Sequence, residues 1–346
     1  MGRTIAVALA LPALAGAAEA QDVGLARDPL PIHGIALPPD TGLRLAVSAK
    51  RPFVLDVDAG TVRSIPLVQR GIVTVVGVGG RAAVVVAKPF SRRGQLYAMR
   101  GQTASLKPLG RGSEVAPASD GQSVWVKRVI RSSRCTLRQV RLDGRVLRSP
   151  KAFRCGWTIY PGGSLGLGVS PVRVIDPVTR RTVFKTRLSI VAVAERTVVL
   201  RGGPGNPLTL FDTATGARRR LAWPDTSGQL ETFRTAVDVR GRFVALSFGN
   251  PSWTSEGRYP DDQYYDAWVL DTRTAELTRL PSMPAFVALK WTSTAWTQDG
   301  RLVLLARSGG KDVVAVWRPG QESLGVKSMR LRARDNIASN AFAPLG

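Results

Sequence analysis

The segment Leu208–Pro224, LTLFDTATGARRRLAWP, contains a pattern that recurs along the chain and decides the fold. Leu208 and Leu210 alternate with a polar residue, as in a strand that is buried on one face. Asp212 and Gly216 then bracket a tight turn, because an aspartate can close a turn with its own carboxylate and a glycine accepts a positive φ. A second extended run follows to the end of the segment. The pattern therefore predicts a β-hairpin.

Similar hairpins can be aligned along the chain, beginning at Phe53, Gln95, Leu137, Val172, Leu208, Ala267 and Val314. Their turns lie 36 to 59 residues apart, with a mean of about 43. A period of about 40 to 45 residues with four strands per repeat is typical of β-propellers. Each interval also holds two further extended runs, and in the first repeat these are residues 32–37, as the first strand, and the run LRLAVSA from Leu43. We therefore predict an all-β, seven-bladed β-propeller of four-stranded antiparallel blades, with a six-bladed ring or two packed β-sandwiches as alternatives.

One repeat carries a more specific motif. The run Trp296–Leu302, WTQDGRL, resembles the aromatic-Ser-Pro-Asp-Gly-Arg/Lys repeat of TolB-like β-propellers, with Gln298 at the place of the usual proline. The run LTLFDTATG is similar to hairpins of many propeller families. The resemblance spans roughly residues 32 to 330 and implies the fold alone, because one fold supports many functions.

The first twenty residues have the layout of a secretory signal. Arg3 precedes an apolar run, and Ala18-Glu19-Ala20 supplies small residues at a cleavage site. We predict a signal peptide over 1–20, a linker over 21–31, the propeller over 32–332 and a C-terminal tail without strand patterning over 333–346. An uncleaved anchor or a buried first strand is the alternative for the N-terminus. No transmembrane segment is expected beyond the signal, so we predict a secreted, extracytoplasmic protein of the cell envelope.

The chain has two cysteines, Cys135 and Cys155, and one histidine. An even pair of cysteines in an exported chain predicts a disulfide, whereas two thiols and one histidine make a poor metal site. We place Cys135 at the start of the third strand of blade three. Cys155 is placed at the start of the first strand of blade four, on the same face of the ring. We expect no cofactor and no metal.

The chain is strongly basic, with 49 Lys and Arg against 25 Asp and Glu and a net charge of +24. Such a charge attracts anionic polymers, and its 40 arginines suit bidentate phosphate binding, although the charge could also serve only solubility. Basic residues recur in the connections between second and third strands, which we expect on one face of the ring. Those of the second and third repeats are Lys88, Arg92, Arg93, Lys127, Arg128, Arg131 and Arg134. Arg92, Arg93, Arg128 and Arg131 are candidate ligand-binding residues.

The sixth repeat is the longest, because it contains the insertion 249–268, GNPSWTSEGRYPDDQYYDAW. Aromatic rings beside carboxylates suit the recognition of a sugar or a peptide, and long loops in compact repeats are often functional. We expect an aromatic wall with nearby carboxylates beside the central opening of the ring. Alternatively, the loop covers its own blade. The candidate residues are Trp253, Tyr259, Asp261, Asp262, Tyr264 and Tyr265.

The sequence contains little that indicates catalysis. His33 is the one histidine, and no Gly-x-Ser-x-Gly nucleophile motif is present. We therefore predict a non-enzymatic binding or scaffold module of the cell envelope whose partner is an envelope protein, a glycan or an anionic polymer. One alternative is a carbohydrate-active enzyme that uses Asp261, Asp262 or Asp266, since glycoside hydrolysis needs only two carboxylates. A second alternative is nonspecific binding of nucleic acid by the arginines.

Overall fold

The protein is described by a computed structural model in which the following residues are placed: 30–49, 51–67, 73–89, 91–100, 105–131, 133–156, 158–159, 166–168, 172–176, 179, 181–202, 207–226, 231–249, 263–288, 292–331 and 342–346. These residues form strands, turns and loops. Within them, no helix has the length and hydropathy needed to cross a membrane.

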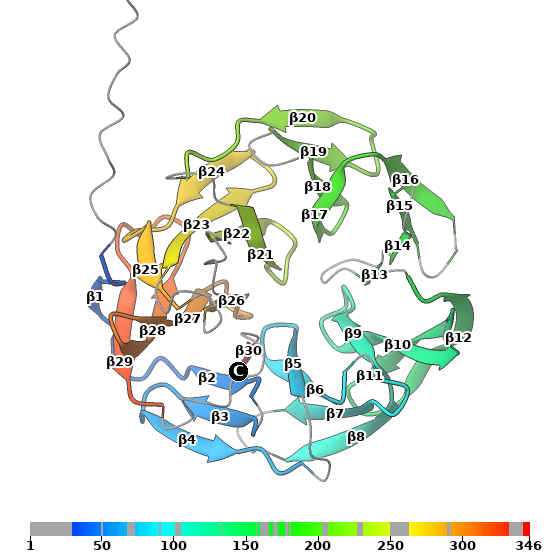
Figure 1. The fold of residues 1–346 in the computed structure, drawn as a ribbon, viewed down its shortest axis with the longest axis horizontal. Coiled ribbons are helices and arrows are strands. Elements are labelled where there is room, and N and C mark those ends of the chain that lie inside the picture. Colours follow the sequence, from blue (N-terminus) through cyan, green and yellow to red (C-terminus); the bar gives the residue numbers. More distant parts are fainter. Residues whose placement is uncertain are drawn as a thin grey trace, which may run out of the picture.

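The described strands form seven small sheets that stand around a central opening (Figure 1). From the inner to the outer strand, blade 1 contains β30 (Phe342–Leu345), β2 (Arg44–Val47), β3 (Phe53–Asp56) and β4 (Thr61–Ser64). Blade 2 contains β5 (Val73–Val78), β6 (Ala82–Ala87), β7 (Gln95–Arg100) and β8 (Leu106–Arg111). Blade 3 contains β9 (Glu114–Pro117), β10 (Ser123–Arg131), β11 (Arg134–Arg141) and β12 (Val146–Arg154).

The other four blades follow in chain order. Blade 4 contains β13 (Thr158–Ile159), β14 (Gly166–Gly168), β15 (Val172–Ile175) and β16 (Thr182–Thr186). Blade 5 contains β17 (Ser189–Ala194), β18 (Thr197–Arg201), β19 (Leu208–Asp212) and β20 (Arg218–Leu221). Blade 6 contains β21 (Glu231–Val237), β22 (Phe243–Gly249), β23 (Gln263–Asp271) and β24 (Glu276–Arg279), and β25 (Ala285–Val287) also pairs with β23. Blade 7 contains β26 (Ser293–Trp296), β27 (Leu302–Ser308), β28 (Lys311–Trp317), β29 (Gly325–Met329) and β1 (Ile35–Ala36).

The repeated hairpins form the third and fourth strands of the blades, as predicted. In blade 5, β19 pairs with β20 from Leu208↔Leu221 to Phe211↔Arg218. The Asp212 carboxylate accepts hydrogen bonds from the backbone N–H groups of Ala214 and Thr215 at 2.8 and 3.0 Å. Gly216 has a φ of 74°, in the region that favours glycine. The prediction of an all-β propeller is confirmed.

The core lies between neighbouring blades. All six residues of β6 are buried, because both faces of this second strand are covered. Val84 and Val86 pack with Val124 and Val126 of blade 3, whereas Val85 packs toward blade 1. The run of consecutive apolar residues in β6 therefore follows from its position inside the ring.

The C-terminus corrects one prediction. Residues 333–346 were expected to form a tail, but β30 is the inner strand of blade 1 and pairs with β2 from Arg44↔Leu345 to Val47↔Phe342. Phe342, Ala343 and Leu345 are buried there. Pro344 has no N–H to donate to a neighbouring strand, but an innermost strand has a free edge where a missing N–H is tolerated. The strand β30 thus completes blade 1, whose other strands are β2, β3 and β4.

The N-terminal segment corrects a second prediction. Residues 32–37 were expected to form the first strand of blade 1, but β1 runs parallel to β29 on the outer edge of blade 7. Gly34 permits this contact, because a Cβ at this position would lie 2.2 Å from the carbonyl oxygen of Leu324. The close approach of two backbones therefore decides where this segment lies.

Candidate functional site

A face of blade 3 changes from apolar to cationic along the strand β10. Val124 and Val126 pack in the core between blades 2 and 3. Arg128 follows on the same face, because successive side chains of a strand alternate between faces, and it is exposed. Pairing continues to the end of the hairpin, where Val129 lies opposite Cys135 and Arg131 lies opposite Arg134. We call the side of the ring on which this hairpin ends the loop face.

The neighbouring strand β11 adds a second arginine to this surface. Arg138 lies opposite Val126 and donates hydrogen bonds from one terminal nitrogen to the carbonyl oxygens of Leu109 and Arg111 in blade 2, at 3.3 and 3.2 Å. Its Nε is buried and has no hydrogen-bond partner. Burial and then the charge of Arg128 lower the pKa of Arg138.

Three arginines then lie side by side across the ends of three strands. Arg131 of β10 is the cross-strand partner of Arg134 of β11, and Arg134 is in turn the partner of Arg154 of β12. All three are exposed. Like charges directly opposite each other destabilise a sheet, so this row opposes the pairing of the strands that carry it.

Backbone hydrogen bonds bring Arg92 and Arg93 of blade 2 to the same part of the loop face. The two arginines are exposed in the turn before Gly94, whose carbonyl accepts a hydrogen bond from the N–H of Gly112 at 3.1 Å. The N–H of the next residue, Ser113, donates to the Lys127 carbonyl at 2.8 Å. These contacts link the turn that carries Arg92 and Arg93 to β10, which carries Arg128 and Arg131, although the two pairs are far apart in the sequence.

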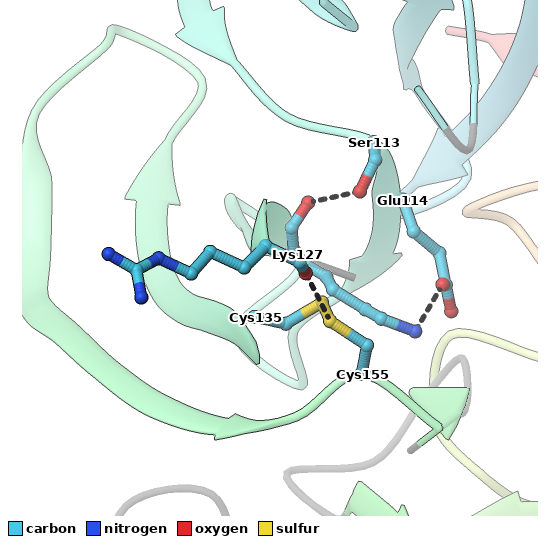
Figure 2. The surroundings of a disulfide bond; sticks show 6 residues. Ser113, Glu114, Lys127, Cys135 and Cys155 are labelled. Carbon is cyan, nitrogen blue, oxygen red and sulfur yellow. Dashed lines mark hydrogen bonds and ion pairs between the residues drawn. A yellow bond between two sulfur atoms is a disulfide. The ribbon is translucent and has the colours of Figure 1, made fainter. Parts of the chain in front are cut away.

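The other face of β10 holds a disulfide and a neutralised lysine (Figure 2). Cys135 and Cys155 are bonded with a Cα–Cα distance of 4.9 Å. Lys127, predicted as part of the basic surface, is instead buried and donates to Glu114 at 2.7 Å. It therefore does not belong to the exposed arginine surface.

The disulfide prediction is confirmed, with one correction of register. Cys155 follows β12 directly instead of opening the first strand of blade 4, which begins at Thr158. The reason is that β12 has nine residues, so the outer strand of blade 3 extends almost to the cysteine. Cys155 Sγ lies 3.6 Å from the Arg131 carbonyl oxygen, so the bridge closes the end of the sheet that carries the arginine row.

We define the arginine face by residues from both blades: Arg92, Arg93, Arg128, Arg131, Arg134, Arg138 and Arg154. Guanidinium groups bind carboxylates and phosphates through two parallel hydrogen bonds, and they stay charged in proteins. The surface can therefore bind a polyanion. No group of three or more His, Cys, Asp and Glu that could hold a metal ion occurs among the placed residues.

Sequence reasoning gave four members of the arginine face as ligand candidates and named Arg134 only among the basic residues of the same face. It missed Arg138 and Arg154. Arg138 could have been found from the alternation of side chains between the two faces of β10 and β11, because this alternation continues past the last valine of the apolar face. Arg154 could not be found this way. Its place opposite Arg134 depends on the register of β12, which has irregularities in its pairing with β11.

A central cavity of about 400 Å³ is lined by inner strands of several blades. Its charged lining residues are Glu195, Arg234 and Asp238. Asp238 accepts hydrogen bonds from the backbone of Phe243 and Arg240, so its carboxylate already serves a turn. None of the predicted ligand-binding residues that the structure describes lines this cavity.

The predicted wall in the sixth repeat is only partly described. Trp253, Tyr259, Asp261 and Asp262 lie outside the described residues. The other two candidates, Tyr264 and Tyr265, were assigned to a loop, but they belong to β23, which pairs with β22 as far as Gly249↔Tyr265. The two strands extend further than the sequence indicated, because β25 adds a second partner for this end of β23.

Tyr265 and Asp266, which belong to the sixth-repeat insertion, are buried and form hydrogen bonds within blade 6. Tyr265 is 1% exposed and its hydroxyl lies 2.8 Å from Ser247 Oγ. Asp266 is fully buried, and its Oδ2 accepts hydrogen bonds from Trp268 and Arg279, each at 3.0 Å. Burial raises the pKa of Asp266, and these partners oppose that shift. Both side chains thus contact their own blade.

The ring of radial sheets around a cavity defines the class of protein: the chain is a β-propeller (Figure 1). It is similar to the propeller domain of the Trilobed protease from Pyrococcus furiosus, with 10% identity over 86% of this chain and 99% of that one and a TM-score of 0.53. It is also similar to the acylaminoacyl peptidase from Pyrococcus horikoshii, with 10% identity over 87% of this chain and 52% of that one and a TM-score of 0.53.

TolB from Acinetobacter baumannii is a third similar structure, with 15% identity over 89% of this chain and 67% of that one and a TM-score of 0.45. No protein-family model and no curated protein sequence matches the chain. At these identities the likenesses show the fold alone. At that level, the resemblance to propeller proteins that the repeat predicts is confirmed.

Proposed function

We propose that this β-propeller is a binding module that holds an anionic polymer on its arginine face. The observation that carries the proposal is the row Arg131, Arg134 and Arg154, aligned across three strands and closed by the Cys135–Cys155 disulfide. The fold does not require three arginines at these positions. A bound polyanion would offset the repulsion between the arginines. Each arginine contact would also release a counterion from the polyanion.

The surroundings of the row support an anionic ligand. Arg138 Nε is a buried donor without a partner in the protein, and a donor in that state is unfavourable unless something accepts its hydrogen bond. Arg128 and the pair in the turn of blade 2 extend the charge beyond the row. Several arginines spread over two blades suit a polymer with repeated negative charges better than a single small anion.

We place the protein outside the cytoplasm. The disulfide supports this location, because structural disulfides form and persist in oxidising compartments and are rare in the cytosol. The apolar N-terminal segment with its small-residue cleavage site also supports export from the cytoplasm. In such a compartment the available polyanions include acidic glycans and phosphate-bearing polymers.

The test is binding of inorganic polyphosphate, carrying a fluorescent label, at several salt concentrations. We expect an affinity that falls steeply with salt, and a slope that decreases by about one unit for each arginine contact removed. The test variant replaces Arg128, Arg131, Arg134 and Arg154 with glutamine.

A matched control removes a similar charge elsewhere, by replacing Arg218, Arg219 and Arg220 of β20, which are exposed on the outer edge of blade 5. We expect the control to keep most of the affinity, because these residues lie on blade 5, two blades along the ring from blade 3 (Figure 1). Equal losses per arginine removed in the two variants would show that net charge alone drives binding and would refute a defined site.

A further inference from the structure

An isoleucine is exposed on β10 between two residues of the arginine face. Ile130 is 45% exposed and lies between Arg128 and Arg131 in β10. The pairing with β11 passes from Val129↔Cys135 to Arg131↔Arg134, so Ile130 is the extra residue of a β-bulge and has no cross-strand partner. A bulge re-aims the side chains around it. The end of the hairpin therefore presents one large exposed apolar side chain on a strand that also carries exposed Arg128 and Arg131.

The strands of this hairpin are longer than those of its neighbour in the ring. β10 and β11 have nine and eight residues, whereas β6 and β7 of blade 2 have six each. On the side opposite the loop face the two blades are level, because a Cβ on Gly79 would lie 2.4 Å from the Gly121 carbonyl oxygen. The extra residues of β10 therefore add length at the loop face, on the order of 10 Å for three residues.

Among the described residues, backbone hydrogen bonds on the side of blade 2 reach β10 at Lys127. Gly112 and Ser113 connect the turn before Gly94 to the backbone of Lys127. The four residues 128–131 lie past this point, and three of them are Arg128, Ile130 and Arg131. Beyond Lys127, the disulfide from Cys135 to Cys155 supports the strand ends. The tip, residues 128–131, is thus a covalently braced element of the loop face.

We propose that this tip docks the protein on a bilayer that contains anionic phospholipids. The arginines bind lipid phosphates, and Ile130 enters the boundary between the headgroups and the acyl chains. A soluble polyanion offers nothing to an exposed isoleucine, whereas cationic residues around an apolar side chain suit a membrane interface. The inference rests on the proposed function, since it names the source of the phosphates for the same arginine face.

The test compares vesicles of phosphatidylcholine and phosphatidylglycerol in equal parts with vesicles of phosphatidylcholine alone, in a sedimentation assay. Every variant is made in the full chain, so that the N-terminal segment contributes equally. Ile130→Ser should lower partitioning to the anionic vesicles about fivefold, as expected when roughly half an isoleucine is no longer buried. Its affinity for polyphosphate should not change.

The matched control is Leu147→Ser, since Leu147 is 40% exposed in β12 of the same blade, near the end away from the loop face. We expect it to leave both affinities unchanged. Arg131→Gln and Arg134→Gln should lower binding to both polyphosphate and anionic vesicles, by about fivefold each for the vesicles. A larger interfacial side chain, in Ile130→Trp, should raise partitioning to the anionic vesicles.

Three results would overturn the membrane proposal. The first is equal vesicle binding by Ile130→Ser and Leu147→Ser, which would leave the arginine face as a site for soluble polyanions. The second is a loss of polyphosphate affinity in Ile130→Ser, which would show that the side chain supports the arginines. The third is equal binding to neutral and anionic vesicles. If the unchanged protein bound anionic vesicles but not polyphosphate, the polymer function would fail while the membrane inference stood.

Discussion

Arg131 and Arg134 lie directly opposite each other at the end of the β10–β11 hairpin, and Arg134 also faces Arg154 on the next strand. Two like-charged pairs in a row are unfavourable for a sheet. The disulfide between Cys135 and Cys155 begins at the residue after Arg134 and ends at the residue after Arg154. The covalent bond therefore holds together the strand ends that the charges push apart.

Removing the central arginine should stabilise the protein while weakening its binding. We expect Arg134→Thr to raise the free energy of unfolding by about 1 kcal/mol, because it eliminates both like-charged pairs. Its affinity for polyphosphate should fall. Urea unfolding and fluorescence anisotropy measure the two effects. Arg220→Thr is the control, since Arg220 is exposed opposite Thr209, and it should change stability by less than about 0.5 kcal/mol. A destabilised Arg134→Thr would contradict the repulsion described above.

Removing the disulfide should have the opposite effect on stability. The bridge joins residues 20 positions apart, and a loop of that length contributes about 3 kcal/mol in the chain-entropy model. We expect the double variant Cys135→Ser, Cys155→Ser to lose about that much, measured by urea unfolding. The unchanged protein should shift by the same amount in a reductant, while the variant should not respond to it. Combining the double variant with Arg134→Thr should recover part of the loss, and a gain equal to the one in the bridged protein would show that charge and bridge act independently.

The C-terminal strand should be essential for the ring. Ala343 is fully buried and packs between blades 1 and 2, so Ala343→Asp places an unpaired carboxylate in an apolar core. We expect a loss of more than about 3 kcal/mol, or a chain that fails to fold. Deletion of residues 342–346 should act similarly, measured by thermal unfolding. Deletion of the exposed Gly346 alone should have little effect, and a truncated chain that melts like the full one would show that β30 does not close blade 1.

Acid should destabilise the protein through the aspartates that close its turns. Backbone hydrogen bonds from Thr215 and Ala214 lower the pKa of Asp212. At Asp120, burial raises the pKa, but hydrogen bonds from Ser123 and Gln122 outweigh it, and the net shift is downward.

Because the folded-state pKa lies below the unfolded one, the stabilisation by these groups is complete above the ordinary aspartate pKa of about 3.9 and is lost as the pH falls through the folded-state values. Urea unfolding at a series of pH values should show this decline. Asp120→Asn together with Asp212→Asn should be less stable at neutral pH and should lose less on acidification. Parallel pH profiles for the variant and the unchanged protein would contradict this role.

The local chemistry of the hairpins could be predicted from the sequence. The Asp212 and Gly216 pattern determines a turn within a few residues, and its repetition at near-regular spacing determines a propeller of four-stranded blades. The disulfide was predicted from the number of cysteines, because two cysteines in an exported chain most simply pair with each other. The turns depend on neighbours in the sequence, which is why they can be derived without the fold.

The sequence did not determine the features that depend on contacts between distant segments. Residues 342–345 become a strand only because blade 1 supplies β2 as a partner and apolar neighbours for Ala343 and Leu345. Residues 35–36 join blade 7 because Gly34 lets two backbones approach. Strand register likewise decides that Arg154 faces Arg134, and burial decides that Tyr265 serves the core. The sequence by itself determined the repeating unit, and the tertiary structure decided how the chain ends close the ring and which arginines meet, because register and burial arise only when the blades pack together.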